Sequence, residues 1–334
     1  MDQVKALTFD VFGTVVDWRT TVVRELVQAA RDKLASPPPA PSPSSSAAAA
    51  GYFTRLASLA EPDWARFAQS WRDSYGVFTR SFVPGETAWK DIDAHHYDSL
   101  VALLVDWGLG SRGAEQDVDN DDDNDGNSGS TAAAAETAEA VTTVYTEPEL
   151  RNLSLVWHRL RPWPDSAAGI HLLGTRYATA TLSNGTRALL SDLNSLPDPP
   201  EAEGPKTGLG FQHIISTADF AAYKPHPSTY RGACAALGCQ PHEVAMVAAH
   251  PGDLRAARAQ GMRTIYVERP REEEWSAEEE RYREAKGEGE ENGEHERTGW
   301  VDIWISEAEG GFLEVARRLG VASSSSSSSS SVFH

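Results

Sequence analysis

The feature that most constrains the fold is a series of short apolar segments, each ending in a polar residue or glycine, with helical patterns between the later ones. The segments are 5–13, 177–185, 211–220, 243–253, 263–268 and 301–306. Helical spacing occupies 227–237 and 254–260, and Gly261 closes the second of these. Strands that alternate with helices predict an α/β fold with a parallel sheet and right-handed crossovers.

A long stretch with helical spacing separates the first predicted strand from the second. Helical spacing without strands runs through 20–34, 64–82, 94–109 and 147–160, and seven of the ten tryptophans fall in this part of the chain. We interpret 17–164 as a helical cap domain inserted into a core formed by 1–16 and 165–320. His95 and His96 are expected on a solvated face of a cap helix.

Several stretches lack the apolar residues that a packed structure needs. They are 36–51 (Pro, Ser and Ala), 113–146 with an acidic run inside 114–136, the charged stretch 271–298, and the Ser-rich tail 321–334. Because they bury little apolar surface to offset the entropy of ordering, we predict that they are disordered or solvated insertions.

Composition excludes some classes of partner. The net charge of −19 argues against nucleic acid, and it fits a small anionic substrate only if the pocket itself is basic. No apolar run reaches about 18 residues and no signal peptide is evident, so we expect a cytoplasmic protein without a membrane segment. Cys234 and Cys239 fit neither a zinc site nor a disulfide framework. A homodimer is compatible with the sequence.

Polar residues follow four of the predicted strands or the loops after them, and these are the candidate site residues. They are Asp10 with Thr14, Ser183 with Asn184, Lys224, and Asp253. Each has a structural alternative: a turn residue, an Asx-type turn, a surface lysine and a helix cap, respectively. Together they predict one site, because ligands of parallel α/β sheets bind beyond the carboxyl ends of the strands. Asp10 is the candidate nucleophile.

The order D-x-x-G-T, helical insertion, S-N-G, K-P and a late Asp resembles the haloacid dehalogenase superfamily. Within it, the sequence is most similar to the (S)-2-haloacid dehalogenases (type II, L-2-haloacid dehalogenases). The resemblance implies a Rossmann-like core with a cap. It also implies hydrolysis of a short (S)-2-haloacid to the (R)-2-hydroxy acid and halide, through an ester on Asp10 and without metal or cofactor.

The resemblance also implies roles for individual residues. Asp10 corresponds to the nucleophile, Lys224 to the lysine beside it, Tyr230 to the tyrosine on the following helix, and Asp253 to the acid near the hydrolytic water. Arg72, in the cap segment SWRDSY, corresponds to the arginine that meets the leaving halide. Thr14, Ser183 and Asn184 correspond to residues that hold the nucleophile and the substrate carboxylate.

Phe12 favours carbon–halogen chemistry over phosphoryl transfer. Phosphatases of the superfamily carry an acid at this position, two residues after the nucleophile, whereas a halide leaves without a proton. The chain also departs from the dehalogenases, because Ala248, His250 and Gly252 stand where these enzymes carry Ser, Asn and an aromatic residue. His250 either replaces the hydrogen bond of the amide or acts as a base.

Two other functions stay open at this point. One is a phosphatase that uses Mg²⁺, with Asp10 as nucleophile and Asp253 as metal ligand. The other is a catalytically silent binding protein whose acidic insertions recruit a partner. Phe12 argues against the first, and the complete set of Asp10, Ser183, Lys224 and Asp253 argues against the second.

Overall fold

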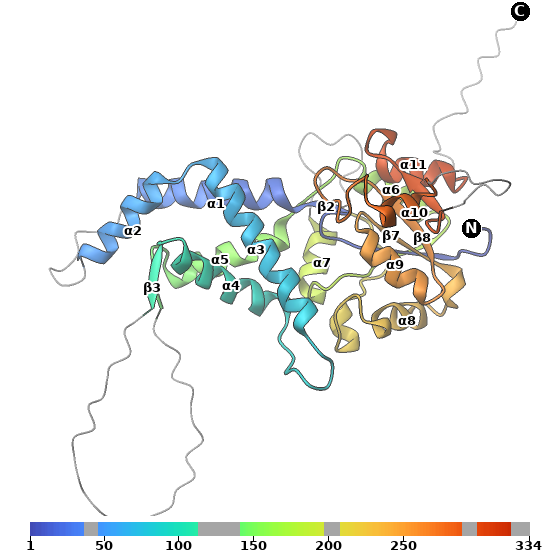
Figure 1. Cartoon of the computed structure of the whole chain (residues 1–334), viewed down its shortest axis with the longest axis horizontal. Helices are drawn as coiled ribbons and strands as arrows, with labels where there is room; N and C mark the ends of the chain where they lie inside the picture. Colours follow the sequence, from blue (N-terminus) through green and yellow to red (C-terminus); the bar gives the residue numbers. More distant parts are fainter. Residues whose placement is uncertain (37–45, 113–140, 197–207, 289–298, 322–334) are drawn as a thin grey trace, which may run out of the picture.

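A five-stranded parallel sheet forms the centre of the larger lobe, on the right of Figure 1. The computed structural model describes residues 1–36, 46–112, 141–196, 208–288 and 299–321. The strand order is β6 (Ala178–Thr181), β1 (Ala6–Phe9), β7 (Val244–Ala248), β8 (Arg263–Val267) and β9 (Ile303–Ile305). This confirms the predicted α/β fold with a parallel sheet.

Helices cover both faces of this sheet, because side chains alternate along each strand. Leu7 and Phe9 of β1 pack in one apolar layer with Phe312, whereas Ala6 packs with Tyr230 and other residues on the opposite face. The first layer contains α6 (Ser166–Leu173) and α11 (Gly311–Arg318). The second contains α8 (Pro227–Ala236) and α9 (Pro251–Ala259), and α7 (Arg187–Ser195) follows β6.

The segment 211–220 is not a strand, and that prediction was wrong. It forms no regular ladder with β6, and meets β6 and the residues after it through isolated bridges, His213 with Ala180 and Ser216 with Ser183, and through side-chain hydrogen bonds. The Thr181 hydroxyl hydrogen-bonds both the N–H and the C=O of Ile215 and thereby replaces regular ladder bonds. The segment ends in the 3₁₀ helix η2 (Thr217–Phe220). Two further 3₁₀ helices lie in the core, η3 (Pro241–Glu243) and η4 (Glu307–Glu309).

The smaller lobe contains the four predicted helical segments and one helix that was not predicted, α2 (Ser46–Ser58). The predicted segments form α1 (Trp18–Ala35), α3 (Glu61–Ser81), α4 (Ile92–Asp106), and α5 (Glu147–Ser154) with the 3₁₀ helix η1 (Leu155–Arg159). Strands β2 (Val16–Asp17) and β5 (Arg161–Pro162) pair where the chain enters and leaves this cap. At the far end, β3 (Gly110–Arg112) pairs with β4 (Val141–Thr143).

Aromatic rings form the centre of the cap, and they correct the expectation for the two histidines. His95 is 9% exposed and His96 is 2% exposed, so neither lies on a solvated face. The His96 ring stacks on Trp157 at 4.6 Å between ring centroids, and His95 stacks on Phe78 at 4.3 Å. Both imidazole rings are therefore part of the aromatic core of the cap.

Three predicted insertions are partly ordered. Residues 46–51 begin α2, and 141–146 include β4 and the buried side chains of Val144 and Tyr145. In the charged stretch, α10 (Glu280–Lys286) forms, and Trp275 and Tyr282 are buried. The remainder of these stretches and the tail, at 37–45, 113–140, 289–298 and 322–334, lie outside the described residues. No helix in the described part is long and apolar enough to cross a membrane.

Candidate active site

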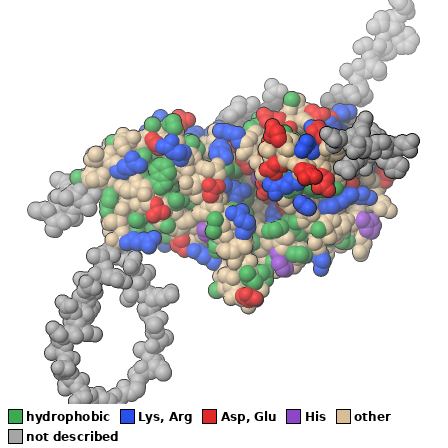
Figure 2. Space-filling view, in the orientation of Figure 1, with side chains coloured by type: hydrophobic (Ala, Val, Ile, Leu, Met, Phe, Trp, Pro, Cys, Tyr) green, Lys and Arg blue, Asp and Glu red, His purple; other side chains and the backbone are tan. Residues whose placement is uncertain are grey.

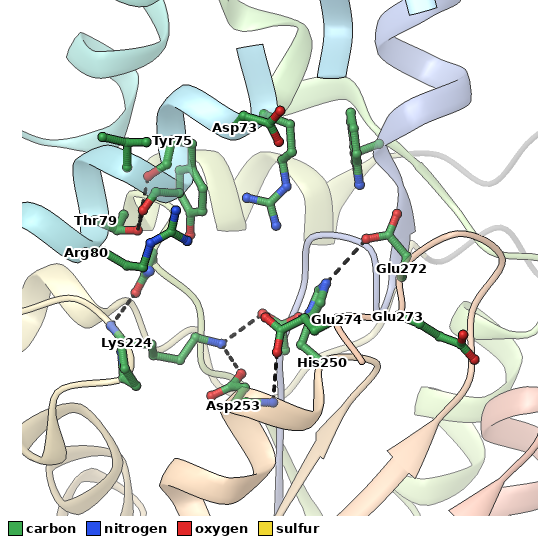
Figure 3. A pocket seen from close by; sticks show the side chains of 18 of the residues that line it. Asp73, Tyr75, Thr79, Arg80, Lys224, His250, Asp253, Glu272, Glu273 and Glu274 are labelled. Carbon is green, nitrogen blue, oxygen red and sulfur yellow. Dashed lines mark hydrogen bonds and ion pairs between the residues drawn. The ribbon is translucent and has the colours of Figure 1, made fainter. Parts of the chain in front are cut away.

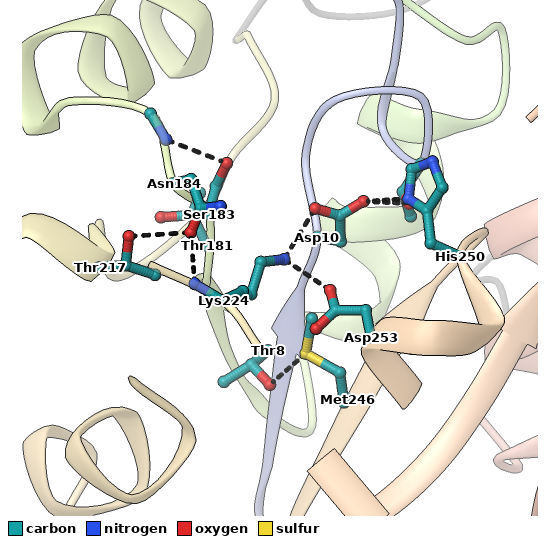
Figure 4. A network of polar contacts seen from close by, with 12 residues as sticks. Thr8, Asp10, Thr181, Ser183, Asn184, Thr217, Lys224, Met246, His250 and Asp253 are labelled. Carbon is teal, nitrogen blue, oxygen red and sulfur yellow. Dashed lines mark hydrogen bonds and ion pairs between the residues drawn. The ribbon is translucent and has the colours of Figure 1, made fainter. Parts of the chain in front are cut away.

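The candidate site lies at the carboxyl edge of the sheet, where the chain leaves three neighbouring strands (Figure 4). Asp10 follows β1, Asn184 follows β6, and His250 and Asp253 follow β7. Lys224 comes from the loop before α8. The sheet therefore brings together side chains separated by as many as 243 positions along the sequence.

Three donors surround the carboxylate of Asp10. Lys224 Nζ donates to Oδ1 at 2.8 Å, and Thr14 Oγ1 donates to Oδ2 at 2.7 Å. His250 Nδ1 lies 2.9 Å from the same Oδ2 atom. The backbone N–H of Ala249 donates to Thr14 Oγ1, so the hydroxyl proton of Thr14 points to Asp10. These contacts fix the carboxylate in one orientation.

The Lys224 ammonium lies between two carboxylates. Its Nζ is 2.8 Å from Asp10 Oδ1 and 2.5 Å from Asp253 Oδ2, and the Tyr230 hydroxyl donates to the other oxygen of Asp253. The backbone N–H of Lys224 donates to Asn184 Oδ1, which holds the loop against the end of β6. Burial lowers the pKa of Lys224, but the two carboxylates outweigh burial and raise it above its usual value.

The pKa values of the two acids beside Lys224, Asp10 and Asp253, are shifted in opposite directions. Burial raises the pKa of Asp10, but Lys224 and His250 outweigh burial and hold this pKa well below its usual range. Burial raises the pKa of Asp253, and the negative charge of Asp10 adds to this effect against the attraction of Lys224. Asp10 is thus the ionised group suited to nucleophilic attack, and Asp253 is the stronger base of the pair.

His250 is held between two acids. Its Nε2 lies 3.3 Å from Glu272 Oε2, and its Nδ1 faces Asp10. Burial lowers the pKa of His250, but Asp10 and Glu272 outweigh it and raise the pKa to about 10, so the ring is an imidazolium near neutral pH. Sequence reasoning missed Glu272 because it belongs to the stretch interpreted as a solvated insertion. The large apolar side chains of Trp275 and Tyr282 in that stretch were the available signal.

A cavity of about 630 Å³ opens between the cap and this site (Figure 3). Its walls include Asp10, Lys224, Tyr230, His250, Asp253 and Asn184 from the core, Trp18, Arg19, Arg72 and Tyr75 from the cap, and Arg271 and Glu272–Glu274 from the loop before α10. Acidic and basic side chains gather on the visible face around the junction of the two lobes (Figure 2). The pocket is therefore polar on the core side and partly aromatic on the cap side.

Arg72 and Arg19 bring positive charge to this cavity. Arg72 lies on α3 with its guanidinium carbon 4.5 Å from the ring centroid of Tyr75. Arg19 lies on α1, and its buried Nε has no hydrogen-bond partner among the residues that the structure describes. Neither residue makes a salt bridge within the described part of the chain. Sequence reasoning singled out Arg72, with Arg19 among the next candidates, and missed Tyr75, which no strand-end pattern marks.

Phe12, which the sequence also suggests as a substrate-binding residue, lies outside the cavity wall, and so do Thr14 and Ser183. The Phe12 ring packs edge-on against Tyr75 and Trp157, and Thr14 points to Asp10. The Ser183 hydroxyl is buried and accepts a hydrogen bond from the N–H of Gly185. In this structure Phe12 and Thr14 contact the cavity-lining side chains of Tyr75 and Asp10, whereas Ser183 stabilises the turn after β6.

Comparison with known proteins adds three findings. The family model described as haloacid dehalogenase-like hydrolase matches residues 4–261. The chain is 32% identical over 114 residues to a haloacetate dehalogenase of Moraxella sp. (33% of this chain, 46% of the relative) and 30% identical over 118 residues to an (S)-2-haloacid dehalogenase of Burkholderia cepacia (35% and 48%). These matches span about half the length of each relative. A crystal structure of an L-2-haloacid dehalogenase superposes with a TM-score of 0.59 at 27% identity, covering 95% of this chain and 99% of that chain.

Proposed function

We propose, since this chain belongs to the haloacid dehalogenase-like hydrolase family, that it hydrolyses short (S)-2-haloacids to (R)-2-hydroxy acids and halide. The observation that carries this proposal is the Asp10 carboxylate, which is kept ionised by Lys224 and His250 and has no acid two residues further on. A nucleophile without a proton donor for its leaving group suits a leaving group that departs as a stable anion.

Asp10 Oδ1 is the attacking atom. A carboxylate oxygen offers about two lone-pair positions, and Oδ2 uses both for Thr14 and His250. Oδ1 accepts from Lys224 alone and keeps one position free. It displaces the halide from C2 with inversion: the new C–O bond forms as the carbon–halogen bond breaks, and the halogen leaves with the bonding electrons.

Arg72 and Arg19 supply the two positive charges that this step needs. A 2-haloacid carries a carboxylate, and negative charge grows on the halogen as it leaves. Both guanidiniums line the cavity, and neither forms a salt bridge with an acid in the described part of the chain. Arg72 faces the halogen and Arg19 binds the substrate carboxylate. Aromatic side chains around Arg72 exclude water and strengthen its effect.

Water then hydrolyses the ester. It adds to the carboxyl carbon of Asp10 and gives a proton to Asp253, whose pKa burial raises. The bond between the carboxyl carbon and the former Oδ1 breaks, and the departing alkoxide takes up that proton. The product hydroxyl therefore carries an oxygen from Asp10, and water replaces the oxygen in the enzyme.

The side chain of Phe12 favours this reaction over the magnesium-dependent phosphatase. Phe12 supplies no proton for a leaving alkoxide. The dehalogenase reaction uses neither metal nor cofactor.

The cytoplasmic location and the homodimer stay predictions from the sequence. The two free thiols, Cys234 and Cys239, fit the first of these.

Halide release is the direct test. Wild-type protein with (S)-2-chloropropionate should release chloride with EDTA present, and Asp10→Asn should not. Single turnover in ¹⁸O-water with excess enzyme should leave the product unlabelled and label the peptide that contains Asp10. No halide from any 2-haloacid, together with phosphate-ester hydrolysis that requires Mg²⁺, would replace this proposal with the phosphatase. Label in the first-turnover product would exclude the ester.

A further inference from the structure

We propose that His250, positioned by Glu272, stabilises the oxyanion formed when water attacks the Asp10 ester. This inference rests on the proposed function, because it concerns the second step of that reaction. It assigns a role to two residues that depart from, or lie outside, the motifs of the sequence. His250 would touch the reacting group directly, and Glu272 would act through His250 as a positioning residue.

The assignment follows from which oxygen of Asp10 stays a carbonyl. If Oδ1 forms the bond to substrate, Oδ2 becomes the carbonyl oxygen of the ester. Oδ2 already has two donors at hydrogen-bond distance, Thr14 Oγ1 at 2.7 Å and His250 Nδ1 at 2.9 Å. When water adds to the carboxyl carbon, negative charge collects on this same atom. A charged donor is then in place before the reaction, as preorganised oxyanion stabilisation requires.

Glu272 fixes the imidazole from its other side. Its Oε2 lies 3.3 Å from His250 Nε2, so a proton on Nε2 has an acceptor and Nδ1–H is directed to Asp10. Glu272 also packs against the turn that follows Asp10. Gly13 has φ +83°, and a Cβ atom built there would lie 2.2 Å from Glu272 Oε2. Glycine at this position therefore admits the carboxylate.

The loop that carries Glu272 is tied to the core at several points. Arg269 makes a bidentate pair with Asp165 and donates to the carbonyl of Thr14. Glu274 accepts from the backbone N–H of Gly252, at the start of α9. These contacts connect the loop to both sides of the nucleophile, so Glu272 holds His250 in a fixed geometry.

Measuring the alkylation step and the hydrolysis step separately distinguishes a catalytic role of His250 from a structural one. His250→Ala should lower steady-state turnover by roughly 10²-fold, as expected for the loss of one oxyanion donor. Glu272→Gln, which keeps an acceptor but removes the charge, should lower it by about 10-fold. In both variants the single-turnover burst of halide should slow much less than turnover, because Lys224 still holds Asp10 ionised, and intact-mass spectrometry should show the ester accumulating on Asp10.

The pH profile gives a second readout. The groups that face the ring are Asp10 and Glu272, with Lys224 on the other oxygen of Asp10 and Arg19 near Glu272. Since the donor must be protonated, hydrolysis should fall as pH rises toward the pKa of His250, and Glu272→Gln should move this fall to lower pH. His250→Asn keeps a neutral donor, so it should recover part of the rate and remove this titration.

Glu278→Gln is the matched control, because Glu278 is an exposed acid of the same segment that does not line the cavity. It should turn over like wild type. The inference is overturned if His250→Ala or Glu272→Gln slows the halide burst as much as turnover, or if no ester accumulates. It is also overturned if both variants turn over normally. If the wild-type protein releases no halide at all, the proposed function itself has failed.

Discussion

Replacing Arg72 with alanine separates its effect on catalysis from its effect on stability. Arg72 makes no salt bridge within the described residues, and its folded-state contacts are with the rings of Tyr75 at 4.5 Å and Trp18 at 5.9 Å. A partly exposed cation–π contact contributes about 0.5–1 kcal/mol. Arg72→Ala should therefore lower the free energy of unfolding by no more than about 2 kcal/mol, and the cap should stay folded.

The Arg72→Ala substitution should affect turnover much more than stability. Loss of one preorganised donor to a developing anion costs about 2.7–4 kcal/mol in activation free energy, which is about 10²–10³ in kcat. Because chloride is a poorer leaving group than bromide, the loss should be larger for 2-chloropropionate than for 2-bromopropionate. Arg72→Lys should recover part of the rate, since lysine supplies charge without the planar fork.

The assay is halide release for both substrates beside urea unfolding followed by tryptophan fluorescence. Arg66→Ala is the matched control: Arg66 lies on the same helix, its side chain is 69% exposed, and it pairs with Asp63 outside the cavity. Wild-type turnover by a folded Arg72→Ala variant would show that Arg72 takes no part in catalysis. An equal loss for chloride and bromide would refute the assignment of Arg72 to the halide, even if turnover fell.

Two further predictions concern the cap. Burial lowers the pKa of His95 to about 4, so as the pH falls the unfolded chain takes up a proton on this residue near pH 6.5, before the native state does. The stability of the cap should therefore fall as the pH drops from about 6.5 to 4. In urea titrations, the His95→Phe variant should show a smaller fall. Deletion of 114–136 should leave kcat/KM within a few-fold, because β3 and β4 already pair on either side of it. A loss of activity in a deletion variant with unchanged circular dichroism would show that this stretch reaches the cavity.

The core and its polar edge could be predicted because local signals and topology agree there. A β-branched strand followed by Asp10, or by the segment that contains Asp253, leaves its polar residue at the carboxyl end wherever the sheet forms. Parallel pairing of β1 with β6 and β7 then places these carboxyl ends side by side, so the site could be predicted once the sheet was predicted. The Arg72 position needed the family resemblance, because one arginine on an amphipathic helix has no local signal for a site.

The errors have a common physical cause. Composition measures average hydrophobicity, whereas ordering depends on a few large side chains that find a partner. Trp275 and Tyr282 order a stretch rich in Glu because they pack against Trp300 and Trp304. His96 is buried with its ring stacked on Trp157, and its Nδ1 has no hydrogen-bond partner among the described residues. The segment 211–220 has strand composition, but side-chain hydrogen bonds from Thr181 take the place of the ladder.

The charges of the site explain how a chain of net charge −19 could receive an anion. Asp10, Asp253 and Glu272 face Lys224 and His250, so this buried group carries three negative charges against two positive ones. With asparagine at 250, as in the family pattern, Glu272 would be a buried carboxylate without a cation in contact, at a cost of several kcal/mol. His250 and Glu272 therefore depend on each other. Because Glu272 pairs with His250 and forms no salt bridge with Arg19, the guanidiniums of Arg19 and Arg72 can meet the two negative charges of a haloacid in its transition state.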